Sequence, residues 1–397
     1  MSSVLQALLD RPRFLGWLRS SVPGLDPRDY DVDRLIPRRD GFDLRIRVQA
    51  RDGTWRATAF RIVRGLPKGL PAFALGSWFL VYHEPVEDSH ILVAKALEAN
   101  TSRHVGRMLG ADIVDSSLYS YTPFRRAVIR YVASDAKVYY GKLYRAGQSH
   151  VAFETTNQLR DAGLSDCLAE PAVHLVDLEM IIWREAAGSV LGREYPRDEY
   201  RRGLHRAGIA LKRLHAANVR EILDRPATEL RTLADEMRVT RKYLDRVATL
   251  LDGQPSELER CYADLDRSCV RADEYDPMTL HGDFHDNQIV LSGRSAVILD
   301  LDQIVRGDPA VDIGNFLAHI DFRIAYDRAD DDPLPYAEAF AKGYGDFDDA
   351  RLRRRIVLGH AVSLLRNCCL YVLIPNRLQA LTAACRRVVG LVTEERR

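Results

Sequence analysis

The stretch LHGDFHDNQIVL, residues 280–291, decides how the rest of this 397-residue sequence is interpreted. Its apolar start predicts a short strand that ends at Leu280, and the polar turn after it exposes the carboxylate of Asp283. Gln288 then opens a second apolar run, so a side-chain amide stands at the start of the next predicted strand. The stretch therefore places a carboxylate and an amide close to a tight turn between two strands.

Two acidic segments follow this turn. ILDLD (298–302) is an apolar strand that delivers Asp300 at its end, seventeen residues after Asp283, and GDPAVD (307–312) comes next. One carboxylate can orient an attacking hydroxyl and accept its proton, while another carboxylate and an amide oxygen can hold the magnesium ions that bridge nucleotide phosphates. These ligands are hard oxygens, and the segments offer no soft-ligand set for zinc. The pattern favours phosphoryl transfer.

These segments resemble the catalytic and metal-binding loops of the aminoglycoside phosphotransferase and choline kinase family, which is related to protein kinases. That family reads His-Gly-Asp, four residues and Asn, then an Ile-Asp step, then Gly-Asp-Pro with an aspartate three residues after the proline. The resemblance implies that Asp283 is the catalytic base, Asp300 the principal magnesium ligand and Asp312 a buried aspartate that braces the loop. It also implies that His281 is a structural member of the loop.

The resemblance further implies a fold and a reaction. The fold is expected to be α+β and bilobal, as in protein kinases, with an extra N-terminal cap subdomain. The expected reaction transfers the γ-phosphate of ATP to a hydroxyl of a small molecule, with Mg²⁺ as cofactor. The loop is most similar to those of bacterial maltokinase and glucosamine kinase, because Gln288 replaces the family's usual Asn. We therefore expect a sugar, an amino sugar or an aminoglycoside-like compound as the acceptor.

Gln288 is also the one position that departs from the family pattern, since Asn287 lies one residue out of register. A glutamine still offers an oxygen to a metal, but through one more methylene, so the geometry must shift. Gln288, Asp300 and Asp302 form the predicted metal-ligand set. Asp302 could equally be a carboxylate that lines the site without touching the metal.

Residues 115–186 predict an N-lobe, made of an antiparallel sheet and one helix, that binds the nucleotide. Lys142 lies in a strand of the type that carries the phosphate-pairing lysine in these enzymes, and Lys137 is a competing candidate. Glu154, on the predicted helix, is the expected carboxylate partner of this lysine. No Gly-x-Gly-x-x-Gly loop precedes the strand, so the phosphate flap of protein kinases is absent from the sequence.

Other residues of this lobe are candidates for nucleotide contacts. Arg126 or its neighbour Arg125 could contact phosphate or form a surface pair. The passage MIIWRE (180–185) resembles the strand that leads to the hinge between the lobes, and its backbone, at Ile182 and Arg184, is expected to bind adenine.

The other two parts of the chain are predicted from pattern and position. Residues 42–48 and, in similar style, 55–63 alternate apolar and polar side chains, whereas 89–109 show a helical pattern. Residues 1–114 carry no recognisable motif and are assigned to the cap subdomain by analogy with maltokinase. Residues 187–397 are expected to form a mainly helical C-lobe with the catalytic and metal loops and the acceptor site. Asp327 and the run 330–332 lie where related kinases bind cationic substrates, although a solvated loop would have the same composition.

Composition excludes several classes of partner. The chain has 57 basic and 56 acidic residues, so its net charge of +1 predicts no general attraction to nucleic acid or to an anionic membrane. Its six cysteines form no CxxC pair, so no metal-ligand spacing is present. No apolar run reaches the length of a signal peptide core or a membrane span, and the expected location is the cytoplasm.

Two alternatives to a small-molecule kinase are open at this point. A protein kinase would place Arg where Gly282 stands, and it would need an activation segment longer than the eight residues between Asp300 and Pro309. A nucleotide-binding module without catalysis would not need Asp283, and a test of magnesium-dependent ATP turnover separates it from the enzymes.

Overall fold

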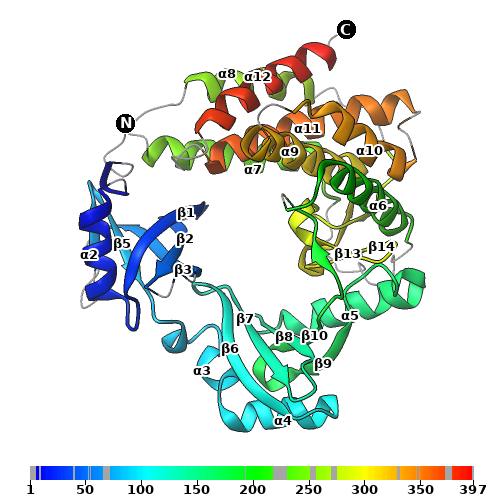
Figure 1. The fold of residues 1–397 in the computed structure, drawn as a ribbon. Coiled ribbons are helices and arrows are strands. Elements are labelled where there is room, and N and C mark those ends of the chain that lie inside the picture. The colour runs from blue at the N-terminus through cyan, green and yellow to red at the C-terminus, as the bar shows by residue number, and fades with distance from the viewer. Residues whose placement is uncertain are drawn as a thin grey trace.

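The computed structural model arranges the chain as three parts in a ring (Figure 1). It describes residues 6–8, 10–38, 41–51, 53, 55–65, 72–192, 194–217, 230–250, 256–269, 275–328, 331–345, 347, 349–371 and 378–395. Asp330, one of the acidic residues considered above, lies outside the described residues.

The first part, here called the cap sheet, is a five-stranded antiparallel sheet with one helix packed on it. Its elements are α2 (Arg11–Ser21), β1 (Pro27–Arg38), β2 (Gly41–Ala50), β3 (Trp55–Arg64), β4 (Ala72–Leu75) and β5 (Trp78–Tyr82), with the strands in the order β1-β2-β3-β5-β4. The alternation that predicts a strand over 42–48 is confirmed, since Leu44, Ile46 and Val48 are buried between exposed arginines. These side chains and Phe14 of α2 form the core of the cap sheet.

The second part, the N-lobe, is also a five-stranded antiparallel sheet. Its strands are β6 (Ile113–Thr122), β7 (Arg126–Ala133), β8 (Val138–Leu143), β9 (Pro171–Leu175) and β10 (Met180–Arg184), in the order β6-β7-β8-β10-β9. Its helices are α3 (Val93–Ala96), α4 (Ala99–Leu109), α5 (Ser149–Leu159) and the short continuation η2 (Arg160–Leu164). Two single helical turns, η1 (Pro85–Glu87) and η3 (Val176–Leu178), complete the lobe. The predicted hairpin of β7 and β8 is confirmed. Val93 and Val105, on helices α3 and α4, share the core of this lobe.

The third part, the helical lobe, holds seven of the described helices and two small sheets. The helices are α6 (Arg197–Ala216), α7 (Leu233–Leu250), α8 (Ser256–Cys269), α9 (Pro309–Asp327), α10 (Leu334–Tyr344), α11 (Ala350–Tyr371) and α12 (Leu378–Glu395); the strands are β11 (Ser189–Val190), β12 (Met278–Leu280), β13 (Ile289–Ser292), β14 (Ser295–Ile298) and β15 (Val305–Gly307), with the turns η4 (Asp286–Gln288) and η5 (Leu301–Gln303). Strands β11, β13 and β14 form one sheet, and β12 pairs with β15.

The ring closes because the cap sheet contacts both other parts (Figure 1). Strand β3 lies against β6 of the N-lobe, whereas β1 lies against α7 and α11 of the helical lobe. The buried residues of the cap sheet belong to the same apolar cluster as those of the helical lobe, and the N-lobe sheet has a separate core. Among the described helices, none combines the length and the apolar character that crossing a membrane requires.

Helices α9 and α11 approach so closely that glycine is required where they meet. A Cβ placed on Gly314 would lie 2.3 Å from the carbonyl carbon of Gly359, and one on Gly359 would lie 2.4 Å from the carbonyl oxygen of Ala310. Both contacts are with backbone, which cannot rotate away as a side chain would. The helix that carries Asp312 is therefore held against α11 by backbone contact.

We expect the variant Gly314→Ala to lose about 1–3 kcal/mol of unfolding free energy, because the added methyl group must push the two helices apart. The control is Gly390→Ala in α12, where a Cβ would meet nothing within 4 Å. That variant should be unchanged or more stable by up to about 1 kcal/mol, as expected for alanine in a helix. Urea unfolding measures both values, and equal stability of the two variants would contradict the packing argument.

Candidate active site

The predicted catalytic loop, residues 281–288, starts in a tight turn after β12 that only glycine fits. Gly282 has φ +82°, in the left-handed region, and a Cβ there would lie 2.4 Å from the carbonyl oxygen of Gln303. The side chain of His281 spans the turn: its Nε2 lies 2.8 Å from the carbonyl oxygen of Leu299, and its Nδ1 accepts a hydrogen bond from the amide of Asp283 at 3.3 Å. These two contacts define the tautomer with the proton on Nε2. His281 is thus part of the loop's scaffold.

Asp312, in the first turn of α9, binds the same turn from beneath. Its carboxylate accepts hydrogen bonds from the amides of His281 (2.6 Å) and Gly282 (2.9 Å), and it lies 3.1 Å from Nε2 of His215. Burial opposes ionisation of this group, but the hydrogen bond and charge of His215 and the contacts with His281 outweigh burial and lower the pKa of Asp312. An ionised carboxylate therefore holds the loop, in the position expected from the sequence.

Lys142 of β8 lies between two carboxylates of the helical lobe. Its Nζ is 2.5 Å from Oδ1 of Asp300 and 2.6 Å from Oδ2 of Asp302. Arg126 of β7 adds a second cation, 3.1 Å from Oδ2 of Asp300. Between the two alternatives left open by the sequence, Lys142 lies in this group, whereas Lys137 pairs with Asp135 in an exposed turn.

The two carboxylates of this group differ in acidity. Burial raises the pKa of Asp300, but the charges of Lys142 and Arg126 outweigh burial and hold it far below its usual value. For Asp302, burial together with the negative charge of Asp300 outweighs Lys142, and its pKa is raised. Asp300 is thus the more firmly ionised of the two, and it adopts φ 57°, in the left-handed region that non-glycine residues rarely occupy.

Gln288 and Asp283 complete the group that the sequence predicts. The side-chain nitrogen of Gln288 lies 3.3 Å from Oδ2 of Asp300, so the longer side chain does reach the carboxylate. Asp283 is half-buried, and its Oδ2 accepts a 3.4 Å contact from the side-chain nitrogen of Gln303.

The structure places Glu154, one of the predicted nucleotide-binding residues, away from Lys142. Glu154 is exposed on α5, and Lys142 contacts Asp300 and Asp302 instead, so the predicted Lys142–Glu154 pair is wrong. The physical reason is the phase of α5, which turns the residues around Ala152 and Thr156 inward and Glu154 outward.

The predicted adenine contacts of β10 concern its backbone, much of which is hydrogen-bonded within the sheet. Ile182 is buried inside the sheet and is paired with Gly141 on one side and Val173 on the other. Arg184 donates its backbone N–H to the carbonyl of Glu170 and pairs with the side chain of the same residue. Strand β10 lies directly beside β8, with Ile181 opposite Lys142, and the adenine contacts of its backbone stay a prediction.

Sequence reasoning missed Tyr144, which lies two residues after Lys142, just past the end of β8. Its hydroxyl is 3.0 Å from Oδ1 of Asp302, and the Lys142 ammonium lies 5.2 Å from its ring centroid. Burial, followed by the charges of Asp302 and Asp300, raises the pKa of this phenol well above its usual value. Tyr144 therefore stays protonated and donates a hydrogen bond to Asp302. The period-two spacing from Lys142 was the available signal.

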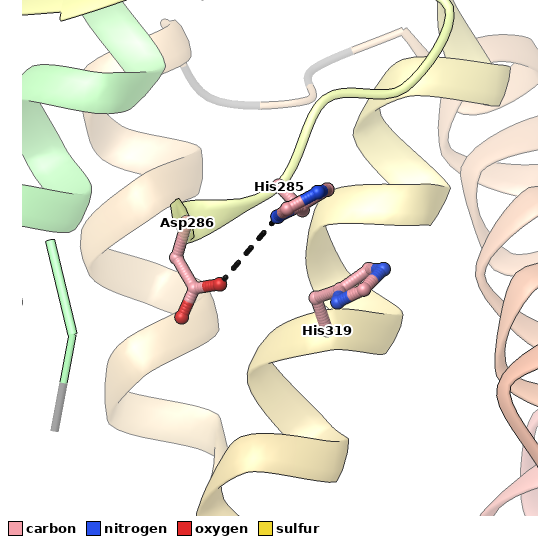
Figure 2. A group of neighbouring side chains, drawn as sticks. All are labelled: His285, Asp286 and His319. Atoms are coloured by element: carbon pink, nitrogen blue, oxygen red, sulfur yellow. Dashed lines mark ion pairs between the residues drawn. The ribbon is translucent and has the colours of Figure 1, made fainter. Parts of the chain in front are cut away.

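A second polar group near the loop has its possible ligand atoms close together, but the two histidine rings are not oriented to bind one metal ion. Figure 2 shows His285 and Asp286 of the loop beside His319 of α9. The two imidazole rings stack with centroids 4.6 Å and planes 20° apart. Ring-nitrogen lone pairs lie in the ring planes, so those of two stacked, nearly parallel rings do not converge on one ion. Asp286 already accepts from Arg323 and, at 3.1 Å, from the hydroxyl of Tyr200. The group packs the loop against α9.

The family model described as APH, the phosphotransferase enzyme family, matches residues 130–355. The match spans more than half of the chain and includes Lys142, the catalytic loop and Asp312. The chain therefore belongs to the phosphotransferase enzyme family. No curated protein matches the sequence significantly.

Solved structures agree with this fold. An ADP-bound aminoglycoside phosphotransferase APH(2'')-Ib aligns over 74% of this chain and 99% of its own, at 14% identity and a TM-score of 0.51. A putative aminoglycoside phosphotransferase from Ralstonia eutropha aligns over 74% and 97%, at 14% identity and a TM-score of 0.51. The streptomycin–ATP–APH(2")-IIa complex aligns over 74% and 96%, at 14% identity and a TM-score of 0.50. At these identities the likeness concerns the fold, and the predicted α+β, bilobal kinase-like architecture is confirmed.

We expect Asp312→Asn to lose about 3 kcal/mol of unfolding free energy at neutral pH, because one loop amide loses its acceptor and His215 loses its charged partner. The native pKa of Asp312 is below its ordinary value of 3.8, so its contribution is complete above that pH and is lost as the pH falls towards the native pKa. The difference between wild type and variant in urea unfolding should therefore narrow below about pH 4. A difference that stays constant on acidification would contradict the assignment.

Proposed function

We propose that this phosphotransferase is an ATP- and Mg²⁺-dependent kinase that transfers the γ-phosphate to a hydroxyl of a sugar, an amino sugar or an aminoglycoside-like compound. One observation carries the proposal: Lys142 of the N-lobe meets Asp300 and Asp302 of the helical lobe beside the loop that bears Asp283. Phosphoryl transfer needs these three kinds of group within one site, because positioning and charge stabilisation supply nearly all of the catalysis.

The groups around Asp300 fit a magnesium ion. Asp300, Asp302 and Gln288 offer two carboxylates and an amide, all with hard oxygens. The carboxylates already converge on a cation, since the Lys142 ammonium lies within 2.6 Å of both. When bound, Mg²⁺ neutralises charge on the nucleotide phosphates. Asp300, Asp302 and Gln288 are the residues that would hold it.

The residues of the chain have separate tasks in this proposal. Asp283 accepts the proton of the acceptor hydroxyl, and its place is fixed by the turn that Asp312 holds. Lys142 exchanges its carboxylate partners for nucleotide phosphates, and Arg126, beside Asp300, adds a positive charge to the same side of the site.

Charge pairing near α9 favours a neutral acceptor over a polycation. Asp327 is held by Arg323 at 3.2 Å, and Asp331 is held by Arg197 and by the hydroxyl of Tyr336. A polycationic aminoglycoside would have to compete with these arginines for the carboxylates. We therefore place neutral sugars first among the acceptors.

The proposal is tested by measuring phosphate transfer from ATP with Mg²⁺ to maltose, glucose, glucosamine and several aminoglycosides. Asp283→Asn should lower kcat by about 100- to 10,000-fold, because general base catalysis is lost, while ATP binding remains. Asp135→Asn, in an exposed turn, is the control and should keep full activity. Equal turnover by Asp283→Asn and wild type would reject the assigned base, and ATP binding without turnover of any acceptor would favour a non-catalytic module.

We also expect Lys142→Met to weaken ATP binding by about tenfold or more, because a phosphate-pairing ammonium is removed from a mostly buried position. Lys137→Met removes a lysine from the neighbouring exposed turn and should leave the Kd unchanged. Isothermal titration with ATP and Mg²⁺ gives both values. A larger rise of the ATP Kd in Lys137→Met than in Lys142→Met would show that Lys137 is the phosphate-pairing lysine.

A further inference from the structure

The peptide groups around Asp283 are held on their carbonyl side as well as on their amide side. Asp312 accepts from the two amides before Asp283, as described above. The carbonyl of Gly282 accepts a hydrogen bond from Nη1 of Arg231 at 2.6 Å. The carbonyl of Phe284 accepts one from Nδ2 of Asn315 at 2.9 Å. The carbonyls directly before and after Asp283 therefore each have a side-chain donor.

Both donors depend on one buried carboxylate, Glu236 of α7, which is 1% exposed. Its Oε1 accepts from Nε of Arg231 at 2.7 Å, and its Oε2 pairs with Arg366 of α11. Arg366 in turn donates to Oδ1 of Asn315 at 2.8 Å. Two chains of contacts thus run from Glu236 to the loop, one through Arg231 and one through Arg366 and Asn315.

The direction of each hydrogen bond follows from this carboxylate. An amide side chain that accepts at its oxygen can donate only at its nitrogen, so the bond from Arg366 turns Nδ2 of Asn315 towards Phe284. Arg231 has a rigid planar fork, so fixing Nε on Glu236 also fixes Nη1 on the carbonyl of Gly282. The charges of Arg366 and Arg231 outweigh burial and lower the pKa of Glu236, which keeps it ionised.

Arg231 also fills the space that glycine leaves at position 282. A Cβ on Gly282 would lie 2.8 Å from Nη1 of Arg231. The backbone of Arg231 is fixed beside the loop, because its N–H donates to the carbonyl of Arg306 and its carbonyl accepts from the amide of Asp308. Protein kinases place an arginine within this loop, whereas here a guanidinium enters from a segment about fifty residues earlier.

We propose that Glu236 is a positioning residue, which orients the catalytic Asp283 by holding the carbonyls on both sides of it through Arg231 and through Arg366 and Asn315. This inference rests on the proposed function, because it takes Asp283 as the group that accepts the acceptor's proton. Its effect should appear in kcat and not in nucleotide binding, because the described hydrogen bonds of these four residues run to the loop and to one another, not to the Lys142–Asp300 group.

The first test is Glu236→Gln, which keeps the shape of the side chain and removes its charge. We expect kcat per folded molecule to fall about 10- to 100-fold, as for a catalytic group displaced by a fraction of an ångström, with the ATP Kd changed less than about threefold. The matched control is Asp321→Asn, another buried carboxylate between two basic side chains of this lobe, His360 and Arg387, neither of which contacts the loop by a described bond. It should lose stability and keep its kcat.

A second variant covers the case in which Glu236→Gln does not fold. Asn315→Ala removes the donor to Phe284 without changing a charge, and it should lower kcat by about tenfold at unchanged ATP Kd. The inference is overturned if the folded variants of both positions keep the wild-type kcat, or if Asp321→Asn loses as much kcat as they do.

Hydrogen exchange separates failure of this inference from failure of the proposed function. If the wild type phosphorylates no acceptor, exchange of the amides in residues 281–289 decides the question without turnover. Faster exchange in Glu236→Gln and Asn315→Ala than in wild type and Asp321→Asn supports the positioning role. Equal exchange in all four proteins rejects it, whatever the reaction of the enzyme is.

Discussion

Asp312 keeps a negative charge inside the helical lobe, and the loop of residues 281–288 takes its form from the hydrogen bonds and the histidine contact that stabilise this charge. The carboxylate joins the loop amides to α9 and contacts His215 on α6, which in turn contacts the hydroxyl of Tyr344 on α10 at 2.8 Å. An ionised group without these partners would cost several kcal/mol in such a setting, so the elements that supply them have little freedom to rearrange. The close backbone packing of α9 on α11 at Gly314 then also fixes the position of α11 relative to the loop.

Charge is used differently where the lobes meet. Asp300 and Asp302 are partly accessible, and their cation comes from the other lobe on the side chain of Lys142. Asp312 has all of its described partners in one lobe, which suits a fixed scaffold. Asp300 and Asp302 pair with the long side chain of Lys142, which can move away when a ligand binds, and this suits a ligand site. Asp300 and Asp302, on one side, and Asp312 of α9, on the other, thus have distinct structural tasks, although the sequence shows them only as acids near one another.

The local parts of the fold and site were predictable, and the long-range parts were not. Alternation along 42–48 and along β7 and β8 identifies strands because one face of each is buried. The motif around Asp283 fixes its own neighbours through short turns. The contact of Glu236 with Arg366 spans 130 residues and leaves no periodic trace in the sequence. Glu154 failed for a related reason, since one residue of helix phase, about 100°, decides whether a side chain faces the site. The loop's similarity to maltokinase and glucosamine kinase remains a prediction.

The position of the cap sheet has a mechanical consequence. It lies against β6 of the N-lobe through β3 and against α7 and α11 of the helical lobe through β1, and the two lobes also touch each other at Lys142 (Figure 1). The cap sheet, the N-lobe and the helical lobe thus each contact the other two. The angle between any two of these parts cannot change while the other two contacts stay as they are. Any rotation of the N-lobe that admits nucleotide must therefore be accompanied by movement at the contacts of the cap sheet with the other two parts. The energy barrier of that movement then contributes to the rate at which the lobes open.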